Sequence, residues 1–385
     1  MVDSRDGVIP RSVAVLGSTG SIGTTALRVI ARHPDRFRVS ALTAYNNAPL
    51  LGEQVRALSP GFVGLVNGNG RQSAQGWITG VGCLVDAAEL PGTDIVLNAI
   101  VGAAGLDATM AALRAGKRVA LANKETLVLA GGIVMAAARQ GGGEIVPIDS
   151  EHSAILQCIA GRSRADIRRV ILTASGGPFR GWSAQQLADV TVDDALRHPT
   201  WQMGRKITVD SATLANKALE VIEAHFLFDL PYDRIEVIVH PQSVVHSMVE
   251  FVDGSVIAQL GAPSMELPVL YALTHPDRIE DDAVARFDPI ERSPLTFEPV
   301  AQDEFPALRL GYRAAKAGGA APAVFNAANE AAVALFLEGK LRFPQIPQAI
   351  ESALDELGGM SSNTRDDLLL ADSRARVHVE ARFGR

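Results

Sequence analysis

The sequence predicts an α/β protein in three parts: a doubly wound parallel sheet at the N-terminus, an α+β segment in the middle and a helical C-terminal part. Over residues 12–149, short runs rich in β-branched residues alternate with helical stretches, which is the pattern of a parallel sheet covered by helices on both faces. Two later runs, 234–251 and 254–261, alternate with a period near two and indicate a mixed or antiparallel sheet. From residue 303 onward the pattern is helical throughout.

The elements of the first part alternate along the chain. Strands are expected at 13–17, 38–44, 62–66, 93–100, 118–122 and 143–148, and helices at 24–33, 49–58, 106–116 and 125–140. The middle part is expected to hold a helix at 152–161, a strand at 168–174 and a helix that begins at Ala212. Three prolines mark residues 276–302 as an irregular linker. We therefore expect domains over 1–149, 150–275 and 303–385.

Composition excludes several classes of protein. The chain of 385 residues carries a formal charge of −7 with no block of Lys or Arg, so nucleic acid is not an expected partner. Its two cysteines, Cys83 and Cys158, are too few for a disulfide framework and have no second zinc ligand nearby. The first residues lack the apolar core of a secretion signal and no run is long enough to span a membrane. We expect a soluble, cytoplasmic protein.

The first strand leads into a glycine-rich turn, "GSTGSIG", with Gly17, Gly20 and Gly23 at the start of a helix. Glycines there let backbone N–H groups approach a pyrophosphate, whose charge the helix N-terminus favours. Glycines also serve ordinary turns, so the strand–turn–helix context carries the interpretation of a Rossmann-like dinucleotide site. The second strand ends at Tyr45-Asn46-Asn47 without the acidic residue that selects NAD, which favours NADP, although no Lys or Arg is present there to meet a 2′-phosphate.

The end of the last predicted strand in the first part carries Asp149 and Glu151. In an extended chain both carboxylates point to one side, a geometry suited to a hard divalent cation. Alternatively, Asp149 or Ser150 caps the following helix, with Glu151 in its first turn.

The stretch "VDSATLANKALE" offers a second candidate site. With Ser211 as the N-cap of the helix from Ala212, Asn216 and Lys217 lie about one turn before Glu220 on one face. The alternative is an ion pair on a solvated surface. The preceding segment carries His198, Trp201 and Met203, an apolar load that a lid over a ligand would explain. Ser175 beside two glycines is a further candidate to meet a phosphate, and Lys124 lies at another strand end, on the edge where doubly wound sheets bind ligands.

Six motifs, in order and spacing, resemble the 1-deoxy-D-xylulose 5-phosphate reductoisomerase family: "GSTGSIG", "ALANKET", "PIDSEHSAI", "SGGPFR", "HPTWQMGRKITVDSATLANKALEVIEAH" and "HPQSVVHSMV", with "NAANEAAVALFL" near the C-terminus. The resemblance covers nearly the whole chain. It implies an NADPH-binding domain, a catalytic domain with a flexible flap, a linker and a helical C-terminal domain in a homodimer. It also implies conversion of 1-deoxy-D-xylulose 5-phosphate, a sugar phosphate, to 2-C-methyl-D-erythritol 4-phosphate in the non-mevalonate route to isoprenoids.

The resemblance also assigns roles to individual residues. The three carboxylates that match the family's ligands for Mg²⁺ or Mn²⁺ are Asp149, Glu151 and Glu220. The residues that match those holding the substrate's phosphate are Ser175, Ser211, Asn216 and Lys217, with Lys124 and Ser150 as further substrate contacts. The flap residues that match are His198, Trp201 and, beside the nicotinamide, Met203. The residues expected to contact the cofactor are Thr19, Gly20, Ser21, Ile22, Asn47, Asn123, Glu125 and Gly204. We expect Lys124, His198 and the three carboxylates to act in catalysis.

Two places depart from the family's usual pattern. Tyr45-Asn46-Asn47 lacks the glycine and the Lys, Arg or Ser that commonly precede the asparagine, and of Ser264-Met265-Glu266 only Met265 corresponds. Two other functions stay open on the residues alone. Another NADP-dependent oxidoreductase of a small phosphorylated substrate would transfer hydride without rearrangement. A silent dinucleotide-sensing module would lack at least one of the three carboxylates, and all three are intact in this sequence. His240 and His246, which lie in a strand pattern, are expected to be structural.

Overall fold

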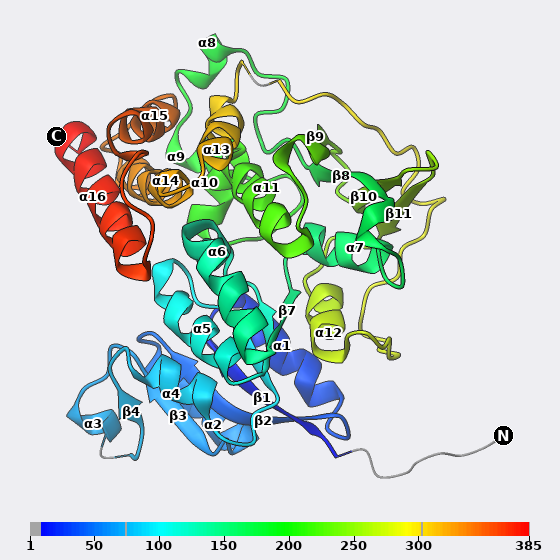
Figure 1. Ribbon diagram of the computed structural model, residues 1–385, viewed down its shortest axis with the longest axis vertical. Coiled ribbons are helices and arrows are strands. Elements are labelled where there is room, and N and C mark those ends of the chain that lie inside the picture. The colour runs from blue at the N-terminus through cyan, green and yellow to red at the C-terminus, as the bar shows by residue number, and fades with distance from the viewer. Residues whose placement is uncertain (1–8, 74, 302, 385) are drawn as a thin grey trace. The chain divides into compact units, whose positions relative to one another are not determined.

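The computed structural model describes residues 9–73, 75–301 and 303–384 (Figure 1). Residues 1–8, where we expect no secretion signal, and residue 302, the end of the expected linker, lie outside the described residues, as does residue 385. By its contacts the chain forms two compact units. The first runs to Thr126 and includes Val134–Ser153 and Ser264–Val284; the second consists of Leu127–Ile133, Ala154–Pro263 and the chain from Ala285 onward. The three-domain division expected from the sequence stays a prediction.

The first unit contains a seven-stranded sheet in the order β4-β3-β2-β1-β5-β6-β7. Every strand pair in it is parallel, as the alternation of strands and helices predicts. Its strands are β1 Arg11–Leu16, β2 Phe37–Ala44, β3 Phe62–Leu65, β4 Ile78–Thr79, β5 Ile95–Asn98, β6 Arg118–Leu121 and β7 Glu144–Pro147. The central strand β1 is buried from Ser12 to Leu16, because helices cover a doubly wound sheet on both faces. The order reverses between β1 and β5, which creates the crevice where such sheets bind ligands.

The helices of this part are α1 Ser21–Arg32, α2 Ala48–Leu58, α3 Gly70–Ser73, α4 Cys83–Glu89, α5 Leu106–Arg114, α6 Lys124–Gly141, α7 Ser150–Cys158 and α12 Glu266–Thr274, with a 3₁₀ turn at Ala103–Gly105; α6 and α7 continue into the second unit. The short elements α3, β4 and α4 were not expected from the sequence. α12 packs on α1, where the Arg32 guanidinium pairs with Asp281 at 2.8 Å and Glu266 at 3.1 Å. Segment 264–284 thus joins the unit that holds the parallel sheet.

The second unit contains a four-stranded mixed sheet in the order β11-β10-β8-β9. Its strands are β8 Ile167–Ala174, β9 Ile235–Val239, β10 Val245–Phe251 and β11 Val256–Leu260. β8 pairs parallel to β9, whereas β10 pairs antiparallel to both β8 and β11. The mixed sheet is as predicted, but the run 234–251 is two strands rather than one. Pro241 has no N–H to donate and Ser243 has a φ of 51°, so the chain turns between β9 and β10.

The helices of the second unit are α8 Ala184–Leu187, α9 Val192–Ala195, α10 Arg205–Thr213, α11 Ala215–Phe228, α13 Pro306–Ala317, α14 Ala321–Leu337, α15 Gln345–Leu357 and α16 Arg365–Phe383, with 3₁₀ turns at Arg164–Asp166 and Tyr232–Arg234. The helical C-terminal part is as predicted. α14 is buried nearly all round and packs against α15 and α16 (Figure 1). Along the described chain, no helix is both long and apolar enough to cross a membrane.

One glycine brings this helical part directly onto the helix that carries Lys217 and Glu220. A Cβ at Gly311 of α13 would lie 2.3 Å from the Cβ of Ala218 in α11, a distance that no side chain tolerates. The backbone of α13 therefore touches the side chain of Ala218 at this point, which holds α13 directly against α11.

Candidate active site

The glycine turn after β1 is shaped by close backbone contacts. Gly17 has a φ of +81°, and a Cβ there would lie 2.7 Å from the carbonyl oxygen of Ala99, just after β5. A Cβ at Gly23 would lie 2.2 Å from the oxygen of Gly17. A side chain at Gly17 would push the turn away from the end of β5, and one at Gly23 would push α1 away from the turn, so both glycines are required for the fold of the turn.

Gly20 differs from the other two because it is exposed, and a Cβ there would lie 3.4 Å from its nearest neighbour, the oxygen of Gly17. It is the N-cap of α1, which has no side-chain cap and no acidic residue in its first turn. The backbone N–H groups at the start of α1, around Ser21 and Ile22, are thus left for an anion, and the helix dipole favours one. Thr19, half-buried, precedes them.

The end of β2 is organised by two amide side chains. Asn47 is the N-cap of α2, since its side-chain oxygen accepts from the backbone N–H of Leu50 at 3.3 Å. Gln54 of α2 accepts from the Ser18 hydroxyl at 2.7 Å and donates to the Ser18 carbonyl at 2.9 Å, which fixes the glycine turn to α2. Tyr45 is 65% exposed, so its ring stands free on the surface of the first unit at the end of the second strand.

Asn123 and Glu125 follow β6 and are buried. The Asn123 side chain donates to the carbonyls of Ile100 and Gly102 and to Glu125, and its oxygen caps α6 by accepting from the N–H of Thr126. These contacts shape the loop after β5, on the same edge of the sheet as the glycine turn. Their expected role as cofactor contacts stays a prediction.

Asp149 and Glu151 follow β7, the neighbour of β6. One oxygen of Asp149 accepts from the backbone N–H groups of Glu151 and His152 at 3.2 and 3.4 Å, so Asp149 caps α7 as the alternative interpretation holds. Its other oxygen is paired with the ammonium of Lys124, and the Ser150 hydroxyl donates to Glu151. The cap uses one oxygen of Asp149, which does not exclude the metal role expected for this residue.

In the second unit, the helix expected from Ala212 with Ser211 as its N-cap is wrong. Ser211 lies in the last turn of α10, and the helix breaks at Leu214, whose φ is +62°. α11 starts at Ala215 and carries Asn216, Lys217 and Glu220 in its first two turns. The break itself has no Gly, Asn or Pro to mark it, so the hydrophobic pattern continues smoothly across it.

The ion pair of α11 is buried, which excludes the solvated-surface alternative. Lys217 is 4% exposed and Glu220 is 1% exposed. The Glu220 carboxylate accepts from the side chains of both Asn216 and Lys217. Taking such charges out of water costs several kcal/mol per ion unless each is paired, so this arrangement has a cost that a purely structural helix would avoid.

Ser175, at the end of β8, and Ser211, in α10, come together around His198. Nε2 of His198 lies 3.0 Å from the hydroxyl of Ser175 and 3.1 Å from that of Ser211. Nδ1 accepts from the backbone N–H groups of Thr200 and Trp201 at 3.1 and 2.9 Å. Nδ1 therefore has no proton, and in the neutral ring Nε2 is the donor. Burial lowers the pKa of His198, which favours this neutral form.

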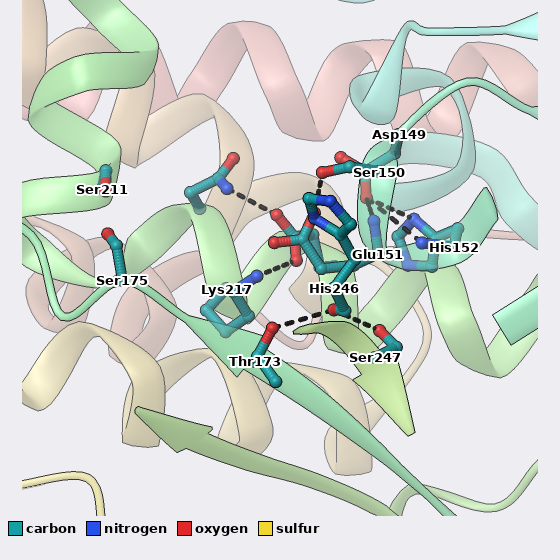
Figure 2. Close-up of polar contacts among 12 residues, drawn as sticks. Asp149, Ser150, Glu151, His152, Thr173, Ser175, Ser211, Lys217, His246 and Ser247 are labelled. Carbon is teal, nitrogen blue, oxygen red and sulfur yellow. Dashed lines mark hydrogen bonds and ion pairs between the residues drawn. The ribbon is translucent and has the colours of Figure 1, made fainter. Parts of the chain in front are cut away.

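The flap residues Trp201, Met203 and Gly204 lie in a segment without regular structure before α10. The Trp201 ring lies 6.3 Å from the ring of His246 in β10, centroid to centroid. Figure 2 shows Thr173 and Ser247 converging on the backbone of His246, whose carbonyl accepts from both hydroxyls. His246 thus lies beside the flap, although the strand pattern suggested only a packing role; its contact with the flap tryptophan could not be read from the sequence.

The glycine turn of the first unit and the residues around Lys217 and His198 of the second unit indicate a class of protein. A doubly wound sheet with a glycine turn and an uncapped first helix is typical of dinucleotide-dependent enzymes, and a buried lysine and serine hydroxyls, as in the second unit, are groups that suit a small anionic substrate.

Comparison with known proteins identifies the family. Three family models match: 1-deoxy-D-xylulose 5-phosphate reductoisomerase over residues 13–131, its C-terminal domain over 145–228, and the DXP reductoisomerase C-terminal domain over 260–378. The 1-deoxy-D-xylulose 5-phosphate reductoisomerase of Geotalea uraniireducens (strain Rf4) is 48% identical over 382 residues, 97% of this chain and 99% of its own. That of Geobacter sp. (strain M21) is 53% identical over 90% of this chain and 91% of its own. The chain belongs to the 1-deoxy-D-xylulose 5-phosphate reductoisomerase family.

Solved structures agree with this assignment. The reductoisomerase of Zymomonas mobilis in complex with NADPH has a TM-score of 0.91 and 43% identity, covering 97% of this chain and 99% of its own. A DOX-P reductoisomerase in complex with NADPH, fosmidomycin and magnesium has a TM-score of 0.92 and 38% identity, covering 97% and 98%. The fold class and the family resemblance found in the sequence are thereby confirmed.

Proposed function

We propose that this chain catalyses the reaction of its family, the NADPH-dependent rearrangement and reduction of 1-deoxy-D-xylulose 5-phosphate to 2-C-methyl-D-erythritol 4-phosphate in the non-mevalonate route to isoprenoids. The observation that carries the proposal is the buried Lys217–Glu220 pair, found together with the Ser175–His198–Ser211 cluster in one unit of a chain of this family. A fold that needed only stability would gain by replacing the buried charges with apolar residues.

The carboxylates Asp149, Glu151 and Glu220 are the residues we assign to a divalent cation, Mg²⁺ or Mn²⁺. All three offer oxygen ligands only, which suits hard cations rather than zinc. Bound there, the cation would act as a Lewis acid on the substrate's oxygen atoms and stabilise the charge that develops in the rearrangement. Lys124 pairs with Asp149 and Lys217 with Glu220, so the two ammonium groups would offset part of the negative charge of carboxylates that share a cation.

The phosphate of the substrate is assigned to Ser175, Ser211, Asn216 and Lys217. The two hydroxyls already face one half-buried imidazole, so they can turn to a phosphate oxygen without moving the backbone. Binding energy from this unreacting end would hold the reacting carbons in place. His198 joins the flap to the pocket, because one ring nitrogen holds Thr200 and Trp201 while the other reaches the serines. Trp201 and Met203 would exclude water when the flap closes.

NADPH is assigned to the first unit. Thr19, Gly20, Ser21 and Ile22 would bind its pyrophosphate with backbone N–H groups, and Asn47 would contact the adenosine ribose. Asn123 and Glu125 would support the cofactor by shaping the loop after β5. Met203 and Gly204 of the flap would lie at the nicotinamide. Two relatives of known structure are complexes with NADPH, which supports this cofactor here.

The assembly we propose is a homodimer in the cytoplasm. β11 is an edge strand with no charged residue, and its Val256 and Leu260 are 51% and 37% exposed. Such an edge invites pairing with another strand, and a second copy of the chain offers one. Cys83 and Cys158 are buried thiols, which fits a reducing compartment.

The test is oxidation of NADPH with 1-deoxy-D-xylulose 5-phosphate and Mn²⁺, with the product identified by NMR. We expect the branched product; an unrearranged alcohol would favour another oxidoreductase, and no turnover would contradict the proposal. Glu220→Gln should lower kcat by at least about a hundredfold, as loss of a charge-stabilising group does, with NADPH affinity unchanged. Glu356→Gln, an exposed carboxylate 62% accessible on α15, is the matched control. Parallel assays with NADH measure the cofactor preference left open by Tyr45-Asn46-Asn47.

A further inference from the structure

The motif "HPQ", His240 to Gln242, follows β9 and was not part of the expected site. Across from it lie residues 294–298, an exposed piece of the expected linker, which we call the strap. None of the strap's five residues is fully buried, and Phe297 is 46% exposed. With so little apolar burial, the position of the strap depends on its polar contacts.

Those contacts come almost entirely from the HPQ motif and the end of β9. Nδ1 of His240 donates to the carbonyl of Thr296 at 2.9 Å, and the buried ring stacks on Phe297 with 4.8 Å between centroids. The Gln242 amide donates to the carbonyl of Pro294 at 3.2 Å and to the Thr296 hydroxyl at 2.9 Å, and it accepts from the Thr296 N–H at 3.3 Å. Both sides of one amide are used, which fixes the strap in one register.

Glu298, the last residue of the strap, connects the strap to the loop that begins at Ser175. Val239 and Glu298 exchange backbone hydrogen bonds at 2.9 Å in both directions, and the Glu298 carboxylate accepts from Arg180 at 2.5 Å. Arg180 lies in the loop "SGGPFR" that starts at Ser175. In that loop Gly176 has so little space that a Cβ would lie 3.0 Å from Arg180 and from Val239.

The HPQ motif also contacts the start of the "SGGPFR" loop directly. The backbone N–H of His240 donates to the carbonyl of Ala174 at 2.7 Å, immediately before Ser175. Pro241, Arg180 and Ser175 line one cavity of about 590 Å³. Two routes therefore run from the HPQ motif to Ser175: one through the backbone of β8, the other through the strap, Glu298 and Arg180.

We propose that Gln242 and Glu298 are positioning residues for the substrate-phosphate pocket: Gln242 holds the strap on the HPQ turn, and Glu298 passes that restraint through Arg180 to the loop of Ser175. Neither side chain needs to touch the substrate. The loop has two glycines at positive φ, Gly176 at 83° and Gly177 at 66°. Because glycine adopts more backbone conformations than other residues, the loop would be less ordered without such a restraint. The proposal rests on the assignment of Ser175 to the phosphate.

The experiment compares Gln242→Ala and Glu298→Gln in the full chain. Each should raise the KM for 1-deoxy-D-xylulose 5-phosphate about fivefold, the effect of losing one hydrogen bond of about 1 kcal/mol. The calorimetric Kd for inorganic phosphate should rise by the same factor. The kcat and the KM for NADPH should stay within about twofold, because neither the metal ligands nor the glycine turn is touched. If both changes act on one route, the double variant should show less than the product of the two effects.

Asp355→Asn is the matched control, since it breaks a similarly exposed arginine pair, Arg313–Asp355, far along the chain in the helical part. It should change none of these constants. Unchanged KM and phosphate affinity in Gln242→Ala and Glu298→Gln would overturn the positioning role, as would a parallel fall of kcat, NADPH affinity and thermal midpoint, which indicates a general structural role. The proposed function is tested separately by turnover of the unchanged protein, whereas phosphate affinity tests the positioning role even without turnover.

Discussion

The carboxylate of Asp210 in α10 accepts a hydrogen bond from the amide of Asn329 in α14, with 2.8 Å between the two atoms. Both side chains are fully buried. The other Asp210 oxygen lies 2.9 Å from the ammonium of Lys206, one turn earlier, as an ion pair whose alignment falls short of a hydrogen bond. Because Ser211 is the next residue, the helical C-terminal part fixes the helix that carries the hydroxyl we assign to the substrate's phosphate.

Removal of the Asn329 amide should therefore weaken the second unit. Asn329→Ala leaves one oxygen of a buried carboxylate unpaired, so we expect the free energy of unfolding in urea to fall by about 1–3 kcal/mol. Asn363→Ala, an exposed asparagine in the loop before α16, should change it by less than about 0.5 kcal/mol. Equal effects of the two substitutions would show that the buried bond carries no net stability.

The parallel sheet could be predicted because each buried strand and each helix leaves its own period in the sequence, as at 13–17 and 24–33. Asp149, Lys217 and Glu220 could be named because their motifs are specific to a family. Leu214 could not be found as a helix break, since its conformation is imposed by packing and no turn residue announces it. The sequence predicted the strap only as part of a linker. Its contacts with Gln242 could not be predicted, because they join residues more than fifty positions apart and no local pattern encodes them.

Because of the break at Leu214, a glycine substitution there should destabilise the protein less than an alanine substitution, the reverse of the usual order in a helix. At a φ of +62° an Ala keeps the backbone strain of about 1 kcal/mol, whereas a Gly does not. Both changes lose the same buried side chain, 3% exposed, at a cost of about 2–5 kcal/mol. We therefore expect Leu214→Gly to be more stable than Leu214→Ala by about 0.5–1 kcal/mol, measured by urea unfolding.

Leu219 supplies the control for this order. It is 1% exposed in the regular part of α11, where Gly should be less stable than Ala by about 1 kcal/mol. If Leu214 followed the same order as Leu219, the left-handed conformation would not be the one adopted in solution.

His198 should make the flap sensitive to pH. Its pKa is lowered from 6.5 by burial, so on acidification the unfolded chain binds a proton before the folded chain does. The free energy of unfolding should fall as the pH drops below about 6.5, and level off below the folded-state pKa. A protonated Nδ1 cannot accept from Thr200 and Trp201, so both amides should lose protection from hydrogen exchange over the same window.

The measurement is the protection factor of these two amides between about pH 8 and about pH 5. His198→Gln should abolish the pH dependence, and His378→Gln, a histidine of α16 bonded to Ser352, should preserve it. Protection that does not change with pH in the unchanged protein would rule out Nδ1 as the acceptor that orders the flap.

The edge of β11 should control assembly. A lysine at the exposed end of an edge strand blocks pairing with another strand, because its charge would be buried in the new ladder. We expect Leu260→Lys to raise the Kd of the homodimer by at least about tenfold, or about 1.4 kcal/mol, with the molar mass measured by light scattering over a dilution series. Leu370→Lys changes a leucine that is 49% exposed on α16 and should leave the mass of the dimer unchanged. A dimer that tolerates Leu260→Lys must use another surface, and a monomeric unchanged protein would contradict the homodimer itself.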